Sequence, residues 1–244
     1  MDPASDNAAA DRLSARAFIL ACCAWLLAKI LLTLLLAAFP AFQANSALSM
    51  LLAHVPLFVF ALPTAFLAWR PLARRVGWRA LLGLETPAES PALRWLLPLV
   101  CSLPLLLVGE ILTKNVLRLW TLCHLPPPPP QFPFLLGGSV TPTCWLVMAF
   151  CSVILAPLGE EIFFRALAPR AFQEVGNAHP VMMAAVIFAL MHLLPQGILT
   201  LTLFGLVCSW RFQRGGLLSA CMLHAMYNAW IFAWWWFVCN CCGE

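Results

Sequence analysis

Charged residues are scarce in this chain. They make up 10% of the 244 residues, while hydrophobic residues make up 63% and the mean hydropathy is +0.89. Soluble domains carry about 25% charged residues, so this composition excludes an ordinary soluble protein. Because each membrane-spanning helix takes ~20 residues, the length leaves no room for a large soluble domain as well. We predict one polytopic membrane domain.

The strict alternation of apolar and polar residues that a membrane barrel requires is also missing. Long apolar runs are present instead, and in hydrocarbon each must satisfy its own backbone hydrogen bonds by forming a helix. The sequence therefore predicts an all-α, polytopic transmembrane helix bundle of about seven spans, with six to eight as the range. The predicted spans are residues 17–39, 47–69, 95–113, 142–158, 180–194, 197–210 and 217–238.

Basic residues are distributed on one side of these spans. With the N-terminus inside, eleven of the fourteen Lys and Arg residues fall on the cytoplasmic side and two fall outside, whereas Lys29 lies within the first span. This bias predicts a cytoplasmic N-terminus. It also accounts for the net charge of +4 without a nucleic-acid partner. Lys29 either snorkels to the interface or pairs with Glu110.

Several common catalytic and metal-binding signatures are absent. There is no G-x-S-x-G nucleophile elbow and no HExxH zinc motif. Most of the eleven cysteines lie in predicted spans, where cysteine acts as a small apolar residue. No C-x-x-C pair has a matching second pair, so no structural zinc site is predicted.

Ionisable residues do occur where the fourth run ends. Glu161 and Arg165 are four residues apart and share one helix face, which predicts a structural ion pair. Glu160 is rotated by about 100° from its neighbour and is left as a free carboxylate. The preceding segment 157–159, Pro-Leu-Gly, is expected to kink or restart the helix and so to open a gap at this site.

Two later runs each carry one histidine. His224 and Asn228 are four residues apart on one face, and Phe188 lies one turn before His192. Any one of these residues alone is explained by helix-to-helix hydrogen bonding. Together with Glu160 they indicate a functional site, because ionisable groups inside a membrane are costly. Three further histidines lack a polar neighbour at helical spacing and are interpreted as structural: His54, His124 and His179.

These residue types suit peptide-bond hydrolysis. Glu160 beside a histidine can activate water, and His224 with Asn228 can donate hydrogen bonds to the oxyanion of a tetrahedral intermediate. Two alternatives stay open. One is a zinc-dependent membrane hydrolase in which His192, His224 and a Glu hold the metal. The other is a non-enzymatic immunity or transport protein that uses the polar cluster as a proton relay or for helix packing.

The three motifs resemble those of a known protein family. Residues 160–165 match EExxxR, residues 188–192 match FxxxH and residues 224–228 match HxxxN, in this order on successive helices. They are similar to the CPBP family of CAAX proteases and bacteriocin-processing enzymes, also called Abi, which includes the type II CAAX prenyl endopeptidases. The resemblance covers about residues 142–238.

The resemblance implies a role for each matched residue. Glu160 and His192 would activate the water, His224 with Asn228 would form the oxyanion hole, and Glu161, Arg165 and Phe188 would give structural support. A glutamic mechanism without metal or cofactor is the one that we favour. The expected partners are membrane lipids and a membrane-associated protein or peptide, cleaved near a C-terminal sorting or anchor signal.

The expected location is a bacterial inner membrane. We divide the chain into a cytoplasmic tail (1–16), N-terminal transmembrane helices without catalytic motifs (17–140) and a catalytic helical core (141–244).

Overall fold

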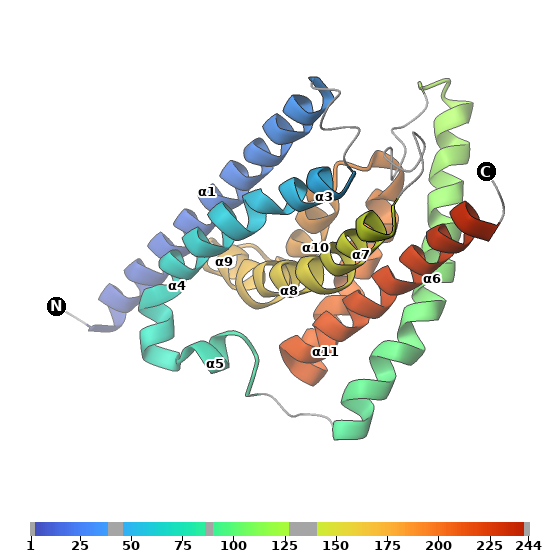
Figure 1. The fold of residues 1–244 in the computed structure, drawn as a ribbon. Coiled ribbons are helices and arrows are strands. Elements are labelled where there is room, and N and C mark those ends of the chain that lie inside the picture. The colour runs from blue at the N-terminus through green and yellow to red at the C-terminus, as the bar shows by residue number, and fades with distance from the viewer. Residues whose placement is uncertain (1–2, 39–45, 86–89, 127–140, 242–244) are drawn as a thin grey trace.

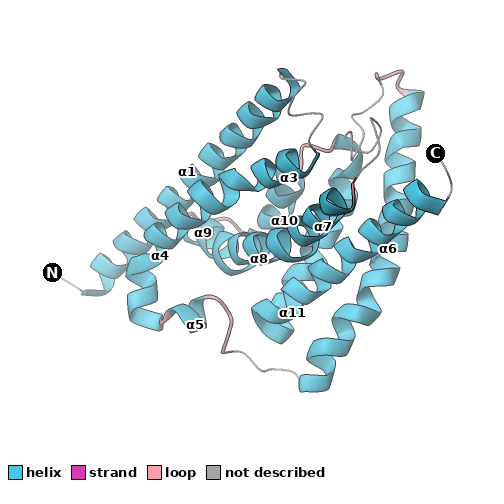
Figure 2. Ribbon diagram, viewed as in Figure 1, coloured by secondary structure: helices cyan, strands magenta, loops and turns pink. Residues whose placement is uncertain are grey.

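The computed structural model describes residues 3–38, 46–85, 90–126 and 141–241. Within these ranges the chain is helical with short turns and contains no strand (Figure 2). The elements in chain order are α1 (Pro3–Ala38), α3 (Ser46–Val55), η1 (Pro56–Ala61), α4 (Leu62–Val76), α5 (Trp78–Leu81), α6 (Pro91–Leu122), α7 (Pro142–Phe150), η3 (Cys151–Leu155), α8 (Ala156–Glu161), η4 (Ile162–Leu167), α9 (Ala168–Glu174), α10 (Pro180–Met191), η5 (Pro195–Gly197) and α11 (Ile198–Cys241). The predicted all-α fold is confirmed.

All seven predicted runs contain helices, but some helices are joined, and the fifth ends at Met191, three residues before the predicted end of its run. The described ranges contain five helices long and apolar enough to cross a membrane: Ser14–Leu35, Leu51–Val76, Pro91–Leu122, Pro142–Glu174 and Pro195–Phe237. The last of these holds the sixth and seventh runs, which meet at a bend where Gly216 has φ 77°. The fifth run, α10, is a shorter apolar helix. The chain is an integral membrane protein.

The outer surface of the bundle is rich in large apolar side chains. Leu20, Leu67 and Leu146 are 69%, 68% and 72% exposed. A soluble protein rarely exposes so much apolar surface to water, whereas in a membrane such a surface contacts lipid tails. The interior contains buried aromatic residues, among them Phe163 and Phe188.

The helices are arranged around the segment that runs from α7 to α9. In Figure 1 α1 and α4 lie side by side on one flank of this segment, and α6 and α11 lie together on the other. Helix α10 packs against both α9 and α11. Helices from both halves of the chain therefore surround the segment that carries the two adjacent glutamates.

Gly109 allows α6 and α11 to approach closely. A Cβ atom at this position would lie 2.7 Å from Cγ2 of Thr200 and 3.1 Å from the Tyr227 hydroxyl. Because the two helices lie so close here, the Thr200 hydroxyl donates a hydrogen bond to the Gly109 carbonyl, at 2.8 Å. Small residues at such crossings let membrane helices gain backbone and side-chain contacts.

The segment from Pro142 to Glu174 differs from the prediction. The apolar run was expected to end at residue 158, and the helix was expected to kink or restart there. The helix does not restart but continues through Pro157 to Glu174. A π-helical turn, η3, directly precedes α8, and a second one, η4, follows it. Proline lacks an N–H, so the wider π turn before Pro157 accommodates the missing helical hydrogen bond. Glu160 and Glu161 consequently lie within a long helix and not at its end.

Candidate active site

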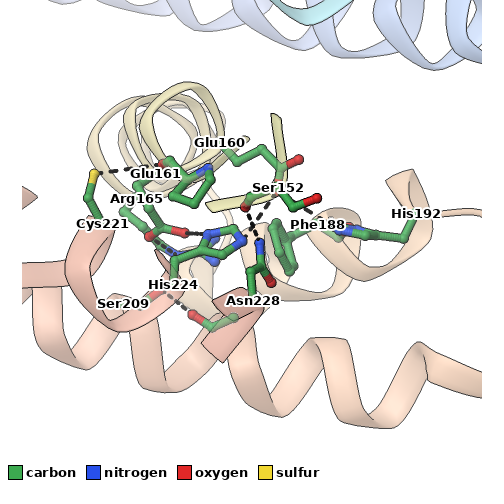
Figure 3. Close-up of polar contacts among 12 residues, drawn as sticks. Ser152, Glu160, Glu161, Arg165, Phe188, His192, Ser209, Cys221, His224 and Asn228 are labelled. Atoms are coloured by element: carbon green, nitrogen blue, oxygen red, sulfur yellow. Dashed lines mark hydrogen bonds and ion pairs between the residues drawn. The ribbon is translucent and has the colours of Figure 1, made fainter. Parts of the chain in front are cut away.

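Glu161 is the most deeply buried acid of the site and makes two contacts. Its Oε2 lies 3.1 Å from Nε of Arg165, and neither side chain is exposed. Its Oε1 lies 2.8 Å from Nδ1 of His224. The predicted Glu161–Arg165 pair is present, as Figure 3 shows. The contact between Glu161 and His224 was not predicted, because helical spacing gives no information about contacts between helices.

Glu160 points away from this pair, as its rotation on the helix predicted. Its Oε2 lies 3.9 Å from Nε2 of His192 and 4.0 Å from Nε2 of His224. This oxygen makes no hydrogen bond to any residue that the structure describes. Both separations are too long for a direct hydrogen bond and suit one intervening water or substrate atom.

The partners of the two imidazoles fix where their protons lie. Nδ1 of His192 is 2.8 Å from the Phe188 carbonyl, which can only accept, so this nitrogen donates. Nδ1 of His224 donates in the same way to the Glu161 carboxylate. In each neutral ring the lone pair is therefore on Nε2, the atom that faces Glu160. A water held there would donate to Glu160 and to an imidazole.

Asn228 is held by the fourth predicted span. Its Nδ2 donates to the backbone carbonyl of Ser152, at 2.7 Å. The amide has two N–H groups, so one is left for a substrate oxygen. Ser152 takes part through its backbone, while its hydroxyl donates to the Met148 carbonyl at 2.7 Å.

Aromatic rings support the polar groups. The ring centroid of Phe188 is 4.6 Å from that of His192, and the Arg165 guanidinium lies 4.6 Å from the Phe188 centroid. Phe204 lies 4.8 Å from the His224 ring. These contacts restrict both imidazoles, as expected for a site that must keep its geometry.

The site opens into a cavity of about 1050 Å³. Glu160, His192, His224 and Asn228 all line it. Such a volume accommodates a large ligand. The four residues predicted from three separate motifs are thus brought to one cavity wall.

Two sequence interpretations change at this cavity. His54, which was interpreted as structural, lines it too. Lys29 also lines the cavity. Within the described part of the chain, Glu110 forms its ion pair with Lys114, at 3.2 Å, and not with Lys29. The other two histidines interpreted as structural, His124 and His179, are exposed.

Gly159 provides a test of how precisely α8 must be placed. A Cβ atom here would lie 2.8 Å from Leu57 and 2.7 Å from Phe58, both in η1. We expect Gly159→Val to push α8 away from η1 and to lower kcat about 10- to 100-fold, because a displacement near 1 Å can have such an effect. The control is Leu158→Val, at a neighbouring residue that is 46% exposed. Equal activity of the two variants in a cleavage assay would contradict this role of Gly159.

Comparison with known proteins identifies the segment that contains the site. Residues 142–230 match the family model described as "Type II CAAX prenyl endopeptidase Rce1-like". This segment is similar to the Rce1-like CAAX proteases. The match confirms the family resemblance found in the motifs, and it indicates an intramembrane protease that acts on a membrane-associated protein. No curated protein and no solved structure matches the chain.

The Rce1-like segment covers little more than a third of the chain. It includes Glu160, His192, His224 and Asn228 but neither Lys29 nor His54. Helices α1, α3, η1 and α6 therefore supply cavity walls that the match does not cover. Among the residues that the structure describes, no three His, Cys, Asp or Glu side chains are arranged as a metal site.

Proposed function

We propose that this Rce1-like chain is an intramembrane endopeptidase that hydrolyses a peptide bond with a water activated by Glu160 and His192. The observation that supports the proposal best is the Glu160 Oε2 atom. It has no hydrogen-bond partner among the described residues and faces two imidazole nitrogens at 3.9 and 4.0 Å on the wall of a large cavity.

The first half of the reaction forms the tetrahedral intermediate. Glu160 takes a proton from the water, and the Nε2 lone pair of His192 accepts a hydrogen bond that orients this water. The oxygen of the water attacks the carbonyl carbon of the scissile bond, and the carbonyl oxygen gains the negative charge. Asn228 donates its second N–H to that oxygen.

The contribution of His224 to oxyanion stabilisation depends on whether its Nε2 carries a proton. A neutral ring that donates from Nδ1 to Glu161 offers a lone pair at Nε2, so it stabilises an oxyanion only as the imidazolium. Glu161 accepts a hydrogen bond from Nδ1–H and so orients the ring, as a buried carboxylate does for a catalytic histidine. The extra proton on His224 comes from water in the cavity as the oxyanion forms and returns to water when the oxyanion collapses, so the overall reaction stays balanced. Arg165 already balances the charge of Glu161.

The second half of the reaction breaks the bond. Protonated Glu160 donates its proton to the leaving nitrogen as the C–N bond breaks, and the products are a carboxylic acid and an amine. The water has then supplied both the hydroxyl of the acid and the proton of the amine. Glu160 returns to the carboxylate form.

We further propose a bacterial inner membrane as the location, with a cytoplasmic N-terminus, and a C-terminal sorting or anchor signal as the segment processed. The basic residues support the orientation, because eleven of fourteen fall on one side of the predicted spans.

The test is cleavage by purified protein in proteoliposomes. The probes are fluorogenic peptides with the same sequence and a free C-terminus, carrying a prenyl group, an acyl group or a transmembrane anchor. We expect cleavage of at least one probe, unchanged by a zinc chelator. Loss of activity on chelation, restored by zinc, would support the zinc hydrolase instead. A properly folded protein that cleaves none of the probes would contradict the proposed function.

A further inference from the structure

Lys29 is a cation in an apolar helix that lines the catalytic cavity. The chain has two lysines, and both line this cavity. Lys114 is exposed and pairs with Glu110 at 3.2 Å. Lys29 is half-buried, and its ammonium takes part in none of the hydrogen bonds or ion pairs recorded for the described residues. A charge is kept inside a membrane span when it has a function or a partner.

The register of α1 directs Lys29 inward. Phe18 and Trp25 share its face of the helix, and their rings lie 4.6 and 4.9 Å from that of Phe163. Phe163 follows Glu160 by three residues in the same long helix. Lys29, one turn beyond Trp25, is thereby held on the face of α1 that meets the catalytic segment.

The opposite face of α1 is turned to the outside of the bundle. Leu20, Leu27 and Leu31 on that face are 69%, 57% and 57% exposed. Figure 1 shows α1 on the flank of the bundle with α4 beside it. Lys29 therefore faces the cavity and not the outer surface of α1.

Among the described residues, no other ionisable group of the cavity forms an ion pair with Lys29, so its charge can interact with a bound ligand. Glu160 lies close enough to interact electrostatically with Lys29, but no ion pair within 4.0 Å joins them. Glu110 is neutralised by Lys114. The remaining titratable groups on the lining are not anionic at neutral pH: His54, His192, His224 and Tyr227. An anion that enters the cavity beside Glu160 would meet Lys29 as its nearest unpaired cation among the described residues.

We propose that Lys29 is a specificity-determining residue that binds a carboxylate of the substrate and so fixes the position of the scissile bond relative to Glu160. A carboxylate accepts a charge-assisted hydrogen bond from an ammonium group, and this bond is strengthened where water is displaced. The carboxylate is either the C-terminal group of the substrate or an acidic side chain. This inference rests on the proposed function.

The experiment compares matched peptides with wild-type protein in proteoliposomes. One peptide ends in a free carboxylate, the second ends in an amide, and the third ends in an amide but has an Asp in place of a neutral residue near the scissile bond. We expect kcat/KM to be about 10- to 100-fold higher for a peptide with a carboxylate than for the neutral amide. The peptide that shows the preference identifies which carboxylate is bound.

Lys29→Met should remove this preference. Its kcat/KM for the carboxylate peptide should fall to the value for the amide, while cleavage of the amide should change less than about threefold. Lys29→Arg should keep part of the preference, because it retains the positive charge. The matched control is Lys114→Met, which changes the other cavity lysine and should keep the full preference.

Three results would contradict either this inference or the proposed function on which it rests. Equal loss by Lys29→Met on carboxylate and amide peptides would show that Lys29 acts on Glu160 and not on the substrate. Equal cleavage of all three peptides by wild-type protein would overturn carboxylate binding while leaving the endopeptidase function intact. No cleavage of any peptide by folded wild-type protein would count against the proposed function itself.

Discussion

Replacing Glu160 by glutamine is expected to lower kcat for peptide cleavage by about 10²- to 10⁴-fold, the usual contribution of a general base. Glutamine has nearly the same size as glutamate but cannot take the proton of the attacking water. Because Oε2 of Glu160 makes no hydrogen bond to a described residue, the substitution breaks no structural contact at that atom. The measurement is single-turnover cleavage in proteoliposomes, together with the thermal unfolding midpoint in detergent.

The matched control for this experiment is Glu110→Gln. Glu110 is another membrane-embedded glutamate on the cavity lining, but its side chain is 60% exposed and paired with Lys114. We expect it to keep most of the cleavage activity. If Glu160→Gln cleaved the probe at a rate similar to that of Glu110→Gln, Glu160 would not be the base, and the proposed mechanism would be wrong.

Replacing Arg165 by methionine is expected to destabilise the fold by about 3–5 kcal/mol, the usual effect of removing one partner from a buried ion pair. The guanidinium and the Glu161 carboxylate are both inaccessible to solvent. Without Arg165, the negative charge of Glu161 would be left in a low-dielectric interior with only His224 as a partner. The thermal unfolding midpoint in detergent should fall accordingly.

The double variant Glu161→Gln/Arg165→Met tests the cause. It removes both charges, so we expect it to be more stable than Arg165→Met alone. Arg170→Met is the control, because Arg170 is an exposed residue further along the same helix, and its substitution should change stability by less than about 0.5 kcal/mol. An unfolding midpoint for Arg165→Met equal to that of Arg170→Met would show that the pair is not important for stability.

Much of the fold could be predicted because helical periodicity and hydropathy are local properties. The seven apolar runs correspond to helical segments, and the Glu161–Arg165 pair lies within one helix, where the four-residue spacing places both side chains on one face. The continuous helix from Pro142 to Glu174 could not be predicted in the same way. Its π-helical turns depend on packing against other helices, which local sequence does not specify.

For the candidate site, the motifs identified which residues carry the chemistry, since a glutamate, two histidines and an asparagine in apolar runs are unusual whatever their arrangement. How they meet was fixed by the packing of α8, α10 and α11. This packing brings Glu160 between two imidazoles and adds the contact between Glu161 and His224. The inward direction of Lys29 likewise depends on the rings of Phe18 and Trp25 against Phe163, because the orientation of a helix face is a property of its neighbours and not of its own residues.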